Sequence, residues 1–191
     1  ANQVLDEFSQ EHSFATVQKK HNLKSPNTAK KYLQYLQNAY LVLALPRFSL
    51  KSFERRSVHK YYAIDPAMIA KRDDALMTES LGLRLENMVA VELKRRAAID
   101  EQIYYFRKVR EYEVDFVRVK GTQVQELIQV TYDFTQPRTK LYNREVGNLV
   151  KASNVLHCDN LTLVMMYGEQ RDIVEGGKTI HCVLATDWLL R

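Results

Sequence analysis

The first third of the chain contains two segments in which hydrophobic residues recur with the period of a helix. Residues 13–21 are predicted as a short helix. Residues 26–38 are predicted as a second helix, because the Ser25 hydroxyl can cap its first turn and Pro26 stands where no backbone N–H donor is needed. The residues of this region expected to face the protein core are Phe14, Val17, His21, Ala29, Leu33, Leu36 and Tyr40.

Two short apolar segments, 41–45 and 61–64, come next and are predicted as strands. The stretch that joins them is basic, with the cations Arg47, Lys51, Arg55, Arg56 and Lys60. The predicted order is helix, short turn, helix, and then two strands joined by a basic stretch. This order resembles a winged helix-turn-helix domain. In such a domain the second helix enters the major groove of DNA and the wing contacts backbone phosphates.

The rest of the chain is predicted as an α/β core that begins with a helix. Helical spacing of hydrophobic residues covers 79–98 and 137–151, and a hairpin turn is expected at Gly176 and Gly177. The predicted strands are 103–107, 112–119, 124–132, 161–167 and 179–184.

Composition limits the class of protein. No apolar run approaches the length of about 20 residues that a membrane-spanning helix needs, and the first residues lack the layout of a signal peptide. Cys158 and Cys182 have no metal-ligand spacing and are expected to be buried thiols. We therefore expect a cytoplasmic protein without membrane contact, and a longer polypeptide that begins before Ala1.

Charge divides the chain into two expected domains, 1–75 and 76–191. The net charge of +5 lies entirely in residues 1–75, which hold 12 Lys and Arg against 7 Asp and Glu, whereas the remainder holds 16 of each. Such an imbalance is typical of an anion-binding surface and indicates DNA as a partner. The residues expected to contact DNA are Lys19, Lys20, Lys24, Asn27, Thr28, Lys30, Lys31, Gln34, Arg55 and Arg56. Two alternatives remain open, a protein–protein adaptor and a lysine-rich helix face that is merely solvated.

Four motifs along the chain resemble one known family. They are Leu85 to Leu93 (LENMVAVEL), Tyr105-Phe106-Arg107, Glu113 to Val117 (EVDFV) and Leu127 to Val130 (LIQV). These motifs are similar to the domain of unknown function that follows the ATPase module in prokaryotic AAA-type ATPases, and the first third of the chain is similar to the winged-helix part of those proteins. The resemblance implies an α/β domain of the PD-(D/E)XK nuclease type after the winged helix, an α+β fold as a whole. It also implies an ATPase module, with ATP and Mg2+, before Ala1.

The same resemblance assigns a nuclease-like site. Glu86 matches a helical glutamate of those nucleases and Asp115 matches the strand aspartate, and both are expected to hold Mg2+ weakly. Gln129 and Thr131 stand where a metal-binding carboxylate and a lysine are expected. Because these substitutions remove one anionic ligand and the only cation, we expect no DNA cleavage, unless Arg107 or Lys140 supplies the missing charge. The ordinary alternatives are a surface charge for Glu86 and an ion pair of Glu113 with Arg107 or Arg110.

These observations favour a DNA-binding and regulatory C-terminal region of an AAA-type ATPase, with no catalysis and no cofactor in this part of the chain beyond weakly held Mg2+. Two other hypotheses stay open. The first is a module that couples the ATP state to a protein partner or to self-association. The second is a metal-dependent DNA nuclease.

Overall fold

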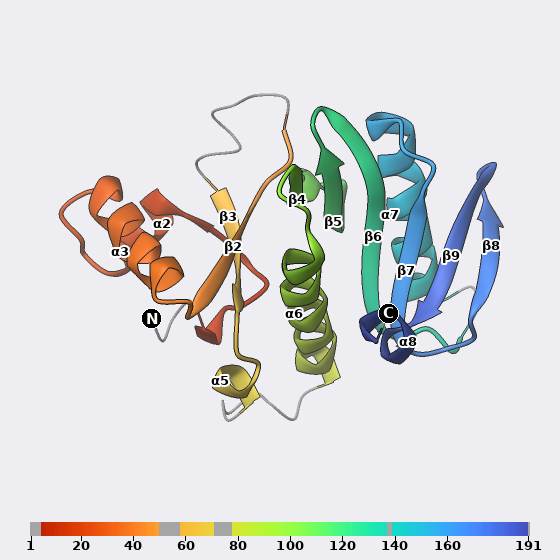
Figure 1. Cartoon of the computed structure of the whole chain (residues 1–191), viewed down its shortest axis with the longest axis horizontal. Helices are drawn as coiled ribbons and strands as arrows, with labels where there is room; N and C mark the ends of the chain where they lie inside the picture. Colours follow the sequence, from red (N-terminus) through yellow and green to blue (C-terminus); the bar gives the residue numbers. More distant parts are fainter. Residues whose placement is uncertain (1–4, 50–57, 71–77, 137–138, 191) are drawn as a thin grey trace.

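The computed structural model describes residues 5–49, 58–70, 78–136 and 139–190, which form a mixed α+β fold with two sheets (Figure 1). Arg55 and Arg56, expected to touch DNA, lie outside the described residues. No helix in the described ranges is long and apolar enough to cross a membrane.

The smaller unit has three strands and two principal helices. The strands β1 (Glu11–Ser13), β2 (Val42–Pro46) and β3 (Val58–Ala63) are antiparallel in the order β1-β3-β2. The helices α2 (Phe14–Lys20) and α3 (Pro26–Asn38) each begin after a serine whose hydroxyl accepts a hydrogen bond from a backbone N–H of the first turn. Both predicted helices are thus confirmed, while β1 was not predicted.

A compact apolar cluster fills the space between these helices and the small sheet. Val17, Ala29 and Leu33 are buried in it against Val42 and Tyr61. Two predictions for this core are wrong. Tyr40 is 79% exposed because the helix ends at Asn38 and the backbone of Tyr40 turns to a φ of 54°, and His21 is exposed at the end of α2.

The larger unit is built on a six-stranded sheet in the order β4-β5-β6-β7-β9-β8. Its strands are β4 (Glu101–Lys108), β5 (Tyr112–Lys120), β6 (Gln123–Asp133), β7 (Leu161–Tyr167), β8 (Arg171–Glu175) and β9 (Lys178–Leu184). β6, β7 and β9 run parallel, and the other neighbouring pairs are antiparallel.

Two long helices cover opposite faces of this sheet (Figure 1). α6 (Thr78–Arg96) packs on the face that presents Phe116 and Ile128, whereas α7 (Lys140–Leu156) packs on the face that presents Val117 and Leu127. Adjacent residues of one strand point to opposite faces, so β4, β5, β6, β7 and β9 each contribute to both clusters, whereas the edge strand β8 contributes Ile173 to the cluster under α7.

Three further elements were not predicted from the sequence: β8, the short helix α5 (Ala67–Ala70) and the C-terminal helix α8 (Ala185–Leu189). The expected hairpin at Gly176 and Gly177 is present, with φ of 56° and 74°, and it joins β8 to β9. Cys158 and Cys182 are buried free thiols, as expected.

The two units share a packed contact. Leu45 and Tyr62 of the small sheet lie in the same apolar cluster as Leu85 and Val89 of α6. Next to them the Asn87 side chain accepts from the backbone N–H of Ala63 at 2.7 Å and donates to its carbonyl at 2.9 Å. Asn87 therefore extends the hydrogen bonding of β3 onto α6.

Candidate functional site

A cluster of buried polar side chains lies between the two units, and Glu86 of α6 is one of its members. Its carboxylate oxygen Oε1 accepts hydrogen bonds from the Tyr62 hydroxyl at 2.8 Å and from the Lys60 ammonium at 3.1 Å. Only 7% of the residue is exposed. The alternative prediction, that Glu86 is a charge on the helix surface, is therefore wrong. The side of α6 that carries Glu86 faces β3.

Lys60 supplies the cation of the cluster and comes from β3. Its Nζ lies 2.5 Å from Oε1 of Glu113, 3.1 Å from Glu86 and 5.6 Å from the centroid of the Tyr105 ring. Burial alone would lower the pKa of Lys60, but the neighbouring carboxylates, Glu86 first, raise it well above its usual value. The buried side chain is therefore held as an ammonium ion.

This finding corrects two sequence-based expectations. Lys60 is not part of an exposed basic stretch, since 4% of it is accessible. Of the two cations expected to supply the missing charge, Lys140 lies elsewhere, exposed at the start of α7. Arg107 does lie at the site, in the same pocket lining as Asp115 and Gln129, and it pairs with Glu11 at 2.6 Å and with Glu113 at 3.6 Å. The predicted ion pair of Arg107 with Glu113 is confirmed, across the β4–β5 ladder.

Asp115 and Gln129 meet on adjacent strands beside this cluster. Oδ2 of Asp115 accepts from the backbone N–H of Val130 at 2.9 Å, and the Gln129 Oε1 accepts weakly from the Asp115 N–H at 3.4 Å. Burial, reinforced by the charge of Glu86, raises the pKa of Asp115 well above its usual value. Thr131 is also buried and lies two residues along β6 from Gln129, on the same side of the sheet.

As with Lys60, the sequence analysis missed Glu145 as a member of the site. This residue lies on α7, is 2% exposed, and its Oε1 accepts from the Arg144 guanidinium at 2.6 Å and 2.9 Å. Burial raises the pKa of Glu145, although Arg144 and the nearby Gln129 amide oppose the shift. One signal was available: Glu145 stands three residues after Tyr142 and four before Leu149, on the apolar side of the predicted helix.

Asp115, Gln129 and Glu145 line one side of an open pocket of about 400 Å³. Four cationic side chains, Arg107, Lys108, Arg110 and Arg144, contribute to the rest of its wall. Within the described ranges, no set of three or more His, Cys, Asp or Glu side chains is arranged as a complete metal site. The buried acids of this wall are Asp115 and Glu145, and beside them Gln129 offers only a neutral amide oxygen.

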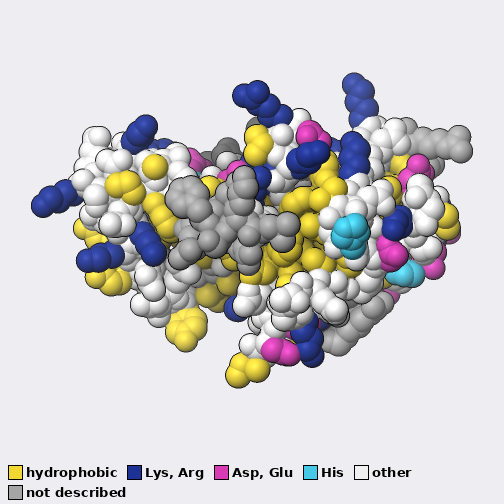
Figure 2. All heavy atoms as spheres, turned by 90° about the horizontal axis from the view of Figure 1, so that it is seen from above, with side chains coloured by type: hydrophobic (Ala, Val, Ile, Leu, Met, Phe, Trp, Pro, Cys, Tyr) yellow, Lys and Arg dark blue, Asp and Glu magenta, His cyan; other side chains and the backbone are white. Residues whose placement is uncertain are grey.

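The predicted DNA-contacting residues that the structure describes lie apart from this pocket, at the end of the molecule formed by α2 and α3. Figure 2 shows lysine and arginine side chains that project from that end. Lys19, Lys24, Asn27, Lys30, Lys31 and Gln34 are exposed. Two of the predicted residues are engaged within the unit: Lys20 pairs with Glu7, and Thr28 bonds through its N–H and hydroxyl to the capping residue Ser25.

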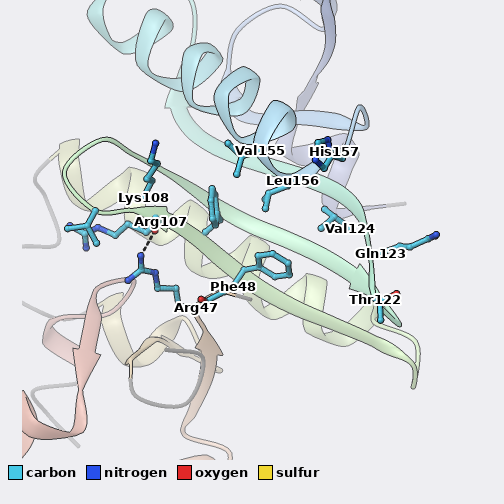
Figure 3. Close-up of a pocket in the computed structure, with 13 residues that line it drawn as sticks. Arg47, Phe48, Arg107, Lys108, Thr122, Gln123, Val124, Val155, Leu156 and His157 are labelled. Atoms are coloured by element: carbon cyan, nitrogen blue, oxygen red, sulfur yellow. Dashed lines mark hydrogen bonds between the residues drawn. The ribbon is translucent and has the colours of Figure 1, made fainter. Parts of the chain in front are cut away.

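A second pocket, of about 850 Å³, lies between the β4–β5 hairpin and the C-terminal end of α7 (Figure 3). Phe48, Val124 and Leu156 give it an apolar lining, and Arg47 and Lys108 stand at one side. The Arg47 guanidinium donates to the Arg107 carbonyl at 2.5 Å, which fixes this wall to β4.

Comparison with known proteins gives relatives without assigned function. The chain is 33% identical over 140 residues, 73% of its length, to the uncharacterized protein MJ1544 of Methanocaldococcus jannaschii, and the match covers 30% of that protein. It is 26% identical over 175 residues, 87% of its length, to an uncharacterized protein of Haemophilus influenzae, of which 38% is covered. The chain thus spans roughly a third of each of these relatives. No solved structure matches it.

Residues 2–79 match the model of a domain of unknown function, DUF8612. The matched range covers the smaller sheet, α2, α3 and α5, and it ends at the first turn of α6. The chain therefore carries a DUF8612 domain in its first 79 residues and has distant uncharacterized relatives in an archaeon and a bacterium.

Proposed function

We propose that this chain is the DNA-binding and regulatory C-terminal region of an AAA-type ATPase, with a nuclease-like larger unit that does not cleave DNA. In this proposal the smaller unit is a winged helix and α3 is its DNA-reading helix. The ATPase module would lie in the part of the longer protein that precedes this chain. The sequence motifs support that placement, and relatives about three times as long as the match have room for a further module.

The observation that carries the DNA-binding proposal is the exposed basic face of α3. Lys30 and Lys31 project from a helix that contains no acidic residue, with Asn27 and Gln34 exposed on the same helix. Lysines supply attraction to phosphates, and exposed amide side chains are suited to hydrogen bonds with base edges. A helix with this composition is compatible with entry into a major groove.

The absence of cleavage is proposed from the chemistry of the buried cluster. Gln129 offers a neutral oxygen where a nuclease of this type has a carboxylate, and Thr131 carries no charge. Lys60 brings a cation, but its ammonium is engaged by Glu86 and Glu113 and is buried. A cation that is held by two carboxylates is poorly placed to stabilise charge on a phosphate.

Duplex DNA binding tests the proposal. Fluorescence anisotropy with a labelled duplex is measured over a range of salt concentrations for the wild type and for a Lys30→Ala/Lys31→Ala variant. Loss of two phosphate contacts should weaken binding at low salt and reduce the slope of log affinity against log salt by about 2. The matched control is Lys94→Ala/Lys120→Ala, which removes two exposed lysines from the larger unit.

The proposal fails if the α3 variant and the control bind duplex DNA equally well. That outcome would favour a second candidate, a protein-interaction surface, for which the exposed Tyr32 and Tyr35 on the same helix are the supporting observation. Tyrosine is enriched at protein interfaces, and these two rings lie 6.4 Å apart.

A further inference from the structure

We propose that the pocket of about 850 Å³ between the β4–β5 hairpin and the end of α7 binds a small organic anion with an apolar body. This pocket shares Arg107 and Lys108 with the smaller pocket, but Asp115 and Gln129 do not line it. Its volume lies in the range typical of sites for small molecules. The inference is independent of DNA binding by α3 and of any cleavage chemistry.

One wall of the pocket is apolar and is built from separate segments of the chain (Figure 3). Phe48 follows β2, Phe106 lies on β4, and Leu156 ends α7. The Phe48 and Phe106 rings meet edge to face, with their centroids 6.4 Å apart. Val109 and Val155 border the same space and are 58% and 53% exposed. A ligand with an apolar body would remove these side chains from water, which stabilises a complex.

The side of the pocket at which Arg47 and Lys108 stand is basic (Figure 3), and none of the described residues that line the pocket is an aspartate or a glutamate. Arg107 is already compensated by Glu11, at 2.6 Å. Arg47 donates to a backbone carbonyl, but its Nε is buried and has no hydrogen-bond partner in the described part of the chain. Lys108 is half exposed, and its pair with Glu111 at 2.8 Å is a weak surface contact. This wall therefore carries positive charge that an anionic group can compensate.

The two walls together select the class of ligand. Inorganic phosphate would use the cations but would leave the apolar wall in contact with water. A neutral or cationic hydrocarbon would cover the apolar wall, but the Arg47 Nε would stay buried without an acceptor, at a cost in free energy. An acidic group on an apolar body satisfies both walls. Decanoate, a linear carboxylate, is a simple probe that has both parts.

Isothermal titration calorimetry on the 191-residue chain compares three ligands. Decanoate carries both parts, decylammonium has a similar chain with the opposite charge, and inorganic phosphate is an anion without an apolar body. We expect decanoate to bind at one saturable site. Decylammonium and phosphate should each bind at least about tenfold more weakly, because each of them matches only one wall of the pocket.

Two variants locate the site. Val155→Glu places a carboxylate at the edge of the pocket and should weaken decanoate binding by about tenfold or more, because like charges repel. Its matched control is Val174→Glu on β8, which changes a valine that is 72% exposed and does not line the pocket, and it should leave the affinity within about twofold. Lys108→Gln should weaken decanoate binding by about two- to fivefold, as expected for a half-exposed charge.

The proposal is overturned if the wild type shows no saturable binding of decanoate, or if decylammonium or phosphate binds as tightly as decanoate. It is also overturned if Val155→Glu and Val174→Glu bind decanoate equally well, because the site would then lie elsewhere. Circular dichroism checks the fold of each variant. If Val155→Glu does not fold, Lys108→Gln is compared with Lys140→Gln, which changes an exposed lysine at the other end of α7. Equal decanoate affinities of these two variants would overturn the proposal as well.

Discussion

Replacing Lys60 with Met should be among the most destabilising single changes in the protein. The substitution preserves much of the side-chain volume but removes an ammonium that is 2.5 Å from Glu113, 3.1 Å from Glu86 and 4% exposed. Loss of one partner from a buried ion pair typically costs about 3–5 kcal/mol, because the other charge stays buried without compensation. For a chain of this size the melting temperature should fall by about 6–20 °C, since 1 kcal/mol corresponds to about 2–4 °C.

The magnitude can be tested with a matched exposed pair and a double variant. Lys108 lies 2.8 Å from Glu111, with both side chains about half exposed, so Lys108→Met should cost at most about 1 kcal/mol. Adding Glu86→Gln to Lys60→Met should restore part of the loss, because the unpaired carboxylate is neutralised. Urea denaturation gives the five free energies of unfolding, those of the wild type, Lys60→Met, Lys108→Met, Glu86→Gln and the double variant. If Lys60→Met costs no more than Lys108→Met, or if Glu86→Gln adds its full cost to that of Lys60→Met, the buried pairing described above is wrong.

Two other changes test how the elements are held. Asn87→Ala should lower the free energy of unfolding by about 2–5 kcal/mol in urea denaturation, because it leaves the buried N–H and carbonyl of Ala63 without their side-chain partner; a loss below 1 kcal/mol would contradict this. Ser25→Ala should cost about 0.5–2 kcal/mol by thermal denaturation, since it removes the oxygen that accepts from the Thr28 N–H at 3.2 Å. An unchanged melting temperature would show that water replaces the cap.

Much of the secondary structure follows from local patterns in the sequence. The helices at 14–20 and 26–38 each have a serine cap and an apolar side, and both were predicted almost to the residue. β1 and β8 were missed because each is short and polar, and only pairing with β3 and β9 makes them strands. These two segments therefore become strands because they pair with β3 and β9, and not because their own residues favour a strand.

The site was predictable in part. Glu86, Asp115 and Gln129 could be named from motif order, and they do lie near one another in the fold. Lys60 could not be identified, because its distance from Glu86 in space depends on how the small sheet packs against α6, which no local pattern encodes. Glu145 could have been found, because a carboxylate within an apolar helix side needs an explanation.

The larger sheet has two outer edges, and the protein protects each one differently. At β4, the chain leaving β2 lies along the strand: the Phe48 N–H donates to the Tyr105 carbonyl at 2.7 Å, so part of this edge is already occupied. At β8, the outer strand is short and carries the exposed charges of Arg171, Asp172 and Glu175. Exposed backbone groups at a sheet edge can recruit strands from other molecules, and short charged edge strands disfavour such association. Loss of the contact between Phe48 and β4 would thus uncover the backbone of the uncharged middle of β4, residues 103–106, and would expose this edge to aggregation.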